Sequence, residues 1–119
     1  MRYGAVFPQS ELAADPMAVR EYLRGVVELG FDHLLVFDHV VGADRASHPD
    51  LAGAYRQEHL FHEILVLLGY AAAVAPELEL VTGVVIAPQR QTALLAKQMA
   101  EIDVLTGGRT RCGLGAGHD

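Results

Sequence analysis

The sequence has little cysteine and little positive charge, and each shortage excludes a kind of site. Cys112 is the only cysteine, so the chain can form no internal disulfide and has no CxxC pair for a metal. Nine lysines and arginines stand against fifteen aspartates and glutamates, which gives a formal net charge of −6. Because phosphate backbones are bound by positively charged faces, we expect no nucleic-acid partner.

Long apolar stretches are also missing. No stretch approaches the roughly 20 apolar residues that a membrane span requires, so we expect no membrane partner. The N-terminus lacks an apolar region behind a basic start, so we do not expect it to be a signal peptide. Hydrophobic residues make up 51% of the 119 residues and charged residues 20%, which is typical of one small globular domain. We expect a cytoplasmic protein.

Short apolar segments alternate with amphipathic segments along the chain. Strands are predicted at residues 3–7, 33–37, 80–87 and 110–114. Helices are predicted from the Asp15-Pro16 cap to Gly30, over 59–75, and from a Thr92 cap to Gly107. The order βαβαβαβ predicts an α/β fold with right-handed crossovers and a parallel sheet. The polar segment 42–57 is predicted to be a long loop.

The same periodicity predicts which side chains are buried. The helix over 59–75 is apolar nearly all round, so we expect it to be deeply packed. Cys112 is expected to be a buried strand residue. The third helix should bury a stripe that consists of Leu95, Met99, Ile102 and Leu105. Four strands with three helices would leave an open sheet edge and an exposed face, which favours self-association into a homo-oligomer.

The candidate chemistry lies where strands end, which is where functional groups gather in α/β folds. Asp38 and His39 follow the second predicted strand. An imidazole titrates near neutral pH and can accept or donate a proton, and an adjacent carboxylate could favour its protonated form or bind a ligand. The alternative is that Asp38 caps the following turn and His39 is solvated, and the residues alone leave both interpretations open.

Glycines mark the third and fourth predicted strands. Gly83 lies inside an apolar strand, where a glycine indicates a bulge or a close backbone approach. The run GLGAG at residues 113–117 would let the backbone approach a phosphate or a ring, or would serve tight strand packing. Its spacing is not that of the dinucleotide fingerprint G-x-G-x-x-G.

Two further histidines allow a second kind of site. His59 and His62 would share a face of the predicted helix, so a metal is conceivable. The HExxH pattern of metalloproteases is absent, and a helix start with imidazoles near solvent or ligand is the favoured interpretation. We assign no metal ligand, although a metal-dependent hydrolase that uses Asp38, His39 and His59 stays an alternative.

Together these segments resemble the N-terminal half of the bacterial luciferase-like monooxygenase superfamily, and most closely its coenzyme F-420 (deazaflavin)-dependent oxidoreductases. The matching segments are ELGFDHLLVFDHVV, HLFHEILVLLGYAAAV, LELVTGVVIAPQRQTALLAKQMAEIDVLTGGR and CGLGAGHD. The resemblance implies a TIM (β/α)8 barrel. Residues 1–119 would then be the first half of the barrel, a single partial domain truncated at its C-terminus.

The resemblance also implies a cofactor, either FMN or coenzyme F-420, at the C-terminal mouth of the barrel. The reaction would be hydride transfer or oxygen insertion on a small organic substrate, with His39 moving the proton and Asp38 orienting the ring or His39. Relatives often have a non-prolyl cis peptide in the third strand, at the position of Gly83-Val84. The implied cofactor-binding residues are Asp38, His39, Gly83, Val84, Ala116, Gly117 and His118. The alternative is a non-catalytic half-barrel that self-associates as a structural or binding module.

Overall fold

The computed structural model describes residues 1–117 except residues 13, 51–54 and 56, and in this part of the chain it forms one parallel sheet covered by helices. The sheet order is β1-β2-β3-β4, and each neighbouring pair is parallel. The strands are β1 Gly4–Val6, β2 His33–Val36, β3 Glu79–Ile86 and β4 Thr110–Gly115. The helices are α1 Pro16–Glu28, α2 Ile64–Val74 and α3 Thr92–Thr106, with a short 3-10 helix, η1, at Ala87–Gln89. The predicted order of elements is confirmed.

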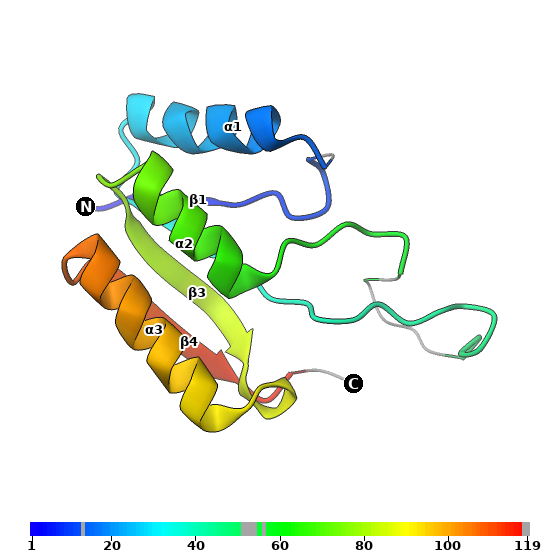
Figure 1. Cartoon of the computed structure of the whole chain (residues 1–119). Coiled ribbons are helices and arrows are strands. Elements are labelled where there is room, and N and C mark those ends of the chain that lie inside the picture. The colour runs from blue at the N-terminus through cyan, green and yellow to red at the C-terminus, as the bar shows by residue number, and fades with distance from the viewer. Residues whose placement is uncertain (13, 51–54, 56, 118–119) are drawn as a thin grey trace.

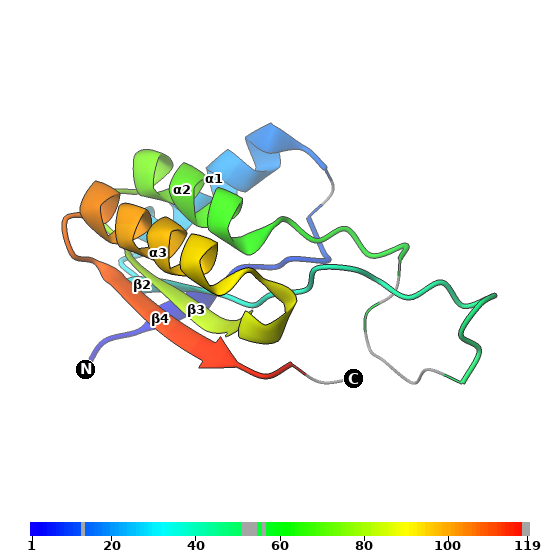
Figure 2. The same cartoon turned by 60° about the horizontal axis from the view of Figure 1, so that its bottom comes forward.

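All three α-helices lie on the same face of the sheet (Figure 2). The core is formed between this helical layer and the side chains that the strands direct toward it, including Leu34, Val36, Leu80 and Val85. A right-handed crossover places each helix on the same side of a parallel sheet, so alternation of strand and helix in the sequence is enough to produce the two layers.

Helix α1 follows directly from local sequence. The Asp15 carboxylate accepts a hydrogen bond from the Met17 backbone N–H at 2.9 Å, and Pro16 occupies the first helical position. Leu23 lies on the buried face of the helix with no exposed surface, and burial of such a side chain contributes about 1.5–3 kcal/mol. Gly30 has a φ of +79°, a left-handed conformation that favours glycine and ends the helix.

Helix α2 begins at Ile64, so the prediction of a helix from residue 59 is wrong. Glu63 is its N-cap, because the side-chain carboxylate accepts a hydrogen bond from the Val66 N–H at 2.9 Å. The His62 N–H donates instead to the side chain of Gln9. The prediction of deep packing is confirmed for one face of the helix, where Leu67 and Leu68 are buried, but not for the other, because Val66 is 70% exposed.

Helix α3 ends at Gly107, as predicted, but its N-cap and part of its buried stripe differ from prediction. Gln91, rather than Thr92, is the N-cap, and its side chain accepts from the Leu94 N–H. In the last turn Leu105 is 62% exposed, while Thr106 is buried in its place. The Thr106 hydroxyl bonds to the Ile102 carbonyl at 2.8 Å, so a polar side chain is satisfied in the core.

The sheet face opposite the helices is uncovered among the described residues (Figure 2), as predicted. Val6 is 56% exposed and Val84 is 38% exposed on this face. Cys112 is exposed rather than buried, because β4 is an edge strand with a neighbour on one side only. In the described parts of the chain, no helix is both long and apolar enough to span a bilayer.

Candidate functional site

The C-terminal ends of β2, β3 and β4 meet at one edge of the sheet, and the described residues that follow β2 extend beyond it (Figure 1). The Asp38 carboxylate accepts a hydrogen bond from the Ile86 N–H, the last residue of β3, at 2.9 Å. Ile86 in turn is paired with Gly115 at the end of β4. The predicted convergence at one edge is therefore confirmed for Asp38 and Gly115, and His39 is the next residue after Asp38.

Asp38 is held by an arginine that the sequence analysis did not single out. Its side chain has no exposed surface. Arg90 Nη2 donates to Asp38 Oδ1 at 2.9 Å, and Arg90 Nη1 donates to Asp38 Oδ2. Both carboxylate oxygens are thus used by Arg90 and β3, which differs from the alternative in which Asp38 caps the following turn. The signal available in the sequence was the PQR string after the third strand.

Arg90 also bonds to a second carboxylate, Glu63 Oε1, at 2.9 Å. Burial by itself lowers the pKa of the Arg90 guanidinium, but its hydrogen bonds to Asp38 and Glu63 outweigh burial and leave that pKa raised. Arg90 is therefore a permanent cation that compensates the buried charge of Asp38.

His39 lies against aromatic rings rather than in solvent. Its ring centroid is 5.0 Å from that of Phe61 and 5.5 Å from that of Tyr55. The His39 Nε2 atom is buried and has no hydrogen-bond partner among the described residues. The alternative of a solvated His39 is therefore wrong. A buried imidazole nitrogen without a partner is costly to a fold and is a position where a ligand atom can bond.

An aromatic cluster beside His39 consists of Phe37, Tyr55 and Phe61. The sequence did not predict this cluster, because the segment between β2 and α2 is mostly polar. The Phe37 ring stacks on Tyr55 at 5.9 Å between centroids, and Phe61 meets Tyr55 edge to face at 4.8 Å. These rings come from both ends of the chain between β2 and α2. They give His39 an apolar setting, in which electrostatic interactions are strengthened.

Strand β3 carries an irregularity at the predicted position. The Gly83-Val84 peptide bond is cis, and the pairing of β3 with β4 shifts register between Thr82 and Val85. A Cβ added at Gly83 would lie 2.9 Å from the side chain of Leu35 on β2, so a larger residue here would force Leu35 to shift. The bulge leaves the Val84 side chain on the uncovered face.

The glycines of β4 make room for this bulge. A Cβ at Gly113 would lie 2.4 Å from the Thr82 carbonyl oxygen, and one at Gly115 would lie 2.5 Å from Val84 Cγ2. A Cβ at Gly117, which has a φ of +86°, would lie 2.9 Å from Ile86 Cγ2. Tight strand packing, one of the two interpretations of this run, is therefore confirmed. Ala116 is exposed beside Gly117, and the predicted site residue His118 lies outside the described residues.

The pair His59 and His62 does not form the predicted helical face, because both residues precede α2. The His62 ring packs edge to face on Phe7, with 5.7 Å between centroids. Within the described residues there is no group of three or more histidines, cysteines, aspartates or glutamates that could hold a metal ion. Asp38, the carboxylate of the metal-hydrolase alternative, is engaged by Arg90.

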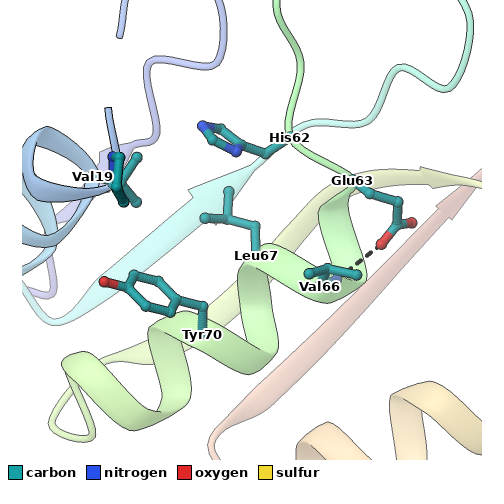
Figure 3. A pocket seen from close by; sticks show the side chains of 7 residues that line it. Val19, His62, Glu63, Val66, Leu67 and Tyr70 are labelled. Atoms are coloured by element: carbon teal, nitrogen blue, oxygen red, sulfur yellow. Dashed lines mark hydrogen bonds between the residues drawn. The ribbon is translucent and has the colours of Figure 1, made fainter. Parts of the chain in front are cut away.

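A separate groove of about 300 Å³ lies on the helical side, between α1 and α2 (Figure 3). It is mostly apolar, and Glu63 stands at its end where α2 begins, with its carboxylate on the Val66 N–H. The lining residues are Pro16, Val19, His62, Glu63, Val66, Leu67 and Tyr70.

The sequence model of the family described as luciferase-like monooxygenase matches residues 3–119. The chain belongs to the luciferase-like monooxygenase family. This match covers all the strands and helices described above, and it confirms the resemblance drawn from the sequence segments.

Solved structures of similar fold agree with this assignment. The oxygenating constituent of 3,6-diketocamphane monooxygenase from Pseudomonas putida, a structure in complex with FMN, is 17% identical with a TM-score of 0.74, over 100% of this chain and 30% of that one. Coenzyme F420-dependent tetrahydromethanopterin reductase from Methanopyrus kandleri is 18% identical with a TM-score of 0.70, over 98% of this chain and 27% of that one. Monooxygenase RslO1 from Streptomyces bottropensis is 26% identical with a TM-score of 0.67, over 97% of this chain and 33% of that one.

The chain thus spans about a third or less of the length of these luciferase-like proteins. Their fold is the TIM barrel, so the four parallel strands and three helices of this chain form a partial barrel, as predicted. Among proteins with curated descriptions, none is similar enough to match.

Proposed function

We propose that the chain is the N-terminal part of a flavin- or deazaflavin-dependent oxidoreductase that acts on a small organic substrate with FMN or coenzyme F-420. One observation carries this proposal: the buried, unpartnered Nε2 of His39 lies at the same edge as the Gly83-Val84 bulge. His39 follows Asp38, whose carboxylate bonds to the last residue of β3, so an imidazole that can exchange a proton lies at the end of the strand that carries the bulge.

The residues at this edge fit a flat redox ring. The Val84 side chain and the backbone of the bulge would contact a face of the ring, and the exposed Ala116 and Gly117 would lie beside it. We expect His118 to complete this group. When bound, the cofactor supplies the hydride-transfer or oxygen-activation chemistry, and the protein supplies binding and orientation.

His39 is the residue we propose to move a proton. A neutral imidazole accepts a proton at Nε2, and an imidazolium donates one from the same atom. Its Nε2 is buried and its ring lies against Phe61 and Tyr55, so the proton would pass to the bound molecule rather than to solvent. Asp38 would act by orienting His39, since its own carboxylate is already neutralised by Arg90.

A binding titration tests the proposal. We expect the chain to quench the fluorescence of coenzyme F-420 or FMN on binding, and His39→Gln to weaken this binding about 10-fold through loss of a hydrogen bond to a buried group. His48→Gln is the matched control, because His48 is exposed in the same loop. Equal affinity of wild type and His39→Gln for both cofactors would contradict the role of His39.

The uncovered sheet face favours one alternative, a non-catalytic half-barrel that self-associates through the face carrying Val6 and Val84. Exposed apolar surface of this kind is a site of protein association. Sedimentation with and without each cofactor distinguishes the two proposals. A homo-oligomer that binds neither FMN nor coenzyme F-420 would favour the structural module, whereas cofactor binding that His39→Gln weakens would favour the oxidoreductase.

A further inference from the structure

Two side chains from distant parts of the sequence bridge the base of the segment that carries His39. The first is Gln9, which follows β1 and is fully buried. Its Nε2 donates to the Phe37 carbonyl at 2.8 Å, and its Oε1 accepts from the His62 N–H at 3.1 Å. Gln9 thereby joins Phe37, which follows β2, to His62, which lies just before α2.

The second bridging residue is Arg90, between β3 and α3. Its guanidinium donates to Asp38 and to Glu63, which are the next residues along the chain after Phe37 and His62. The two bridges are therefore consecutive: one joins positions 37 and 62, and the other joins positions 38 and 63.

The bridges join residues 37 and 38 to residues 62 and 63. His39 comes immediately after the first of these two pairs, and Phe61 comes immediately before the second. Their rings are 5.0 Å apart, so His39 packs across the base that the bridges hold closed. Two carboxylates on one guanidinium suit arginine in particular, because its planar fork donates in several fixed directions, whereas a lysine ammonium is a point charge.

Glu63 extends the bridge to α2. Its Oε1 accepts from Arg90, while its Oε2 accepts from the Val66 N–H at the start of the helix. The position of α2 and the exit of β2 are therefore set by the same guanidinium. Loss of Arg90 would leave the buried Asp38 charge uncompensated and would release both ends of the segment.

We infer that Gln9 and Arg90 are positioning residues that fix the His39 imidazole against Phe61 and so place its Nε2. This inference rests on the proposed function only for its consequence in cofactor binding. The geometry of His39 itself is measurable without a cofactor.

The test compares Arg90→Met, Arg90→Lys and Gln9→Leu with wild type in two measurements. The first is the NMR resonances of the His39 ring in the cofactor-free chain, identified by their loss in His39→Gln. The second is the affinity for coenzyme F-420 and FMN. Arg20→Met is the matched control, because Arg20 is exposed on α1.

We expect Arg90→Met and Gln9→Leu to move the His39 resonances and to weaken cofactor binding about 10-fold, as His39→Gln does. Arg90→Lys should recover only part of both effects, and Arg20→Met should change neither. If Arg90→Met does not fold, Glu63→Gln and Gln9→Leu are judged by the same criteria. Folded variants with unchanged His39 resonances would overturn the inference, even if their melting temperatures fell.

The two proposals fail in different ways. If the wild type binds neither cofactor but the His39 resonances still move in Arg90→Met, the bridging role stands and the proposed function fails. If His39→Gln loses cofactor binding while Arg90→Met and Gln9→Leu match wild type in both measurements, the proposed function stands and the positioning role fails.

Discussion

At the scale of single residues, glycines decide how closely the strands approach one another. Gly83, Gly113 and Gly115 each occupy a place where a Cβ would meet a neighbouring strand at 2.9 Å or less. Real side chains essentially never tolerate such distances, so the bulge of β3 depends on the absence of side chains rather than on a specific contact.

Gly83→Ala tests this dependence. The added methyl would overlap Leu35, and overpacking of this kind costs about 1–3 kcal/mol of unfolding free energy. Urea denaturation at neutral pH measures the change. Gly69→Ala is the matched control, because nothing lies within 4 Å of a Cβ at that helical position, and we expect it to stabilise the chain by up to about 1 kcal/mol. A Gly83→Ala variant as stable as wild type would contradict the account.

Asp38 and Arg90 illustrate what the sequence predicted and what it did not. The position of Asp38 after a buried strand predicted that it lies at the C-terminal edge of the sheet, and this is confirmed. Its partner lies 52 residues further along the chain, and no periodicity or spacing rule connects residues at that separation. The role of Arg90 became visible only when the fold brought β2 and the start of α3 together.

At the scale of elements, local patterns predicted the strands and helices but not all of their ends. The cap at Asp15 and the end of α1 at Gly30 are encoded within a few residues, and both are confirmed. The start of α2 has the Glu63 cap, but the residue before it, His62, donates to Gln9, which is 53 residues away in the chain. The aromatic cluster was missed for the same reason, since Phe37 and Phe61 meet only after the loop closes.

The opposite end of the sheet from His39 carries a network of charges that joins the strands. Arg111 on β4 donates to Glu79 on β3 at 2.7 Å, and Arg2 lies 3.0 Å from the same carboxylate. The hydrogen bond from Arg111 lowers the pKa of Glu79, burial opposes this, and the charges of Arg111, Arg2 and His33 lower it further.

A carboxyl group whose pKa is depressed in the folded state stabilises the fold above its unfolded pKa of about 4.3, and this contribution is lost as the pH falls through the folded value. We therefore expect the melting temperature of Glu79→Gln to fall less than that of wild type between neutral pH and about pH 3. Glu21→Gln, at an exposed position on α1, is the control. Parallel losses for wild type and Glu79→Gln would rule out this contribution.

At the scale of the whole molecule, the two faces of the sheet differ in what covers them. The helices cover one side of the sheet and leave the other side uncovered among the described residues (Figure 2). The strand residues Val6 and Val84 remain exposed. In a closed barrel the corresponding side is filled by side chains from all the strands. The family assignment therefore accounts for the uncovered face, and the proposed cofactor site lies where this face meets the C-terminal edge.

The central claim is that His39 and the β3 bulge contact the same bound ring. The most direct measurement is an NMR experiment on the chain with bound coenzyme F-420 or FMN, which detects through-space contacts from the ring protons. We predict contacts both to the His39 imidazole and to the Val84 methyl groups. Contacts to the groove residues Leu67 and Tyr70, with none to His39 or Val84, would contradict the account.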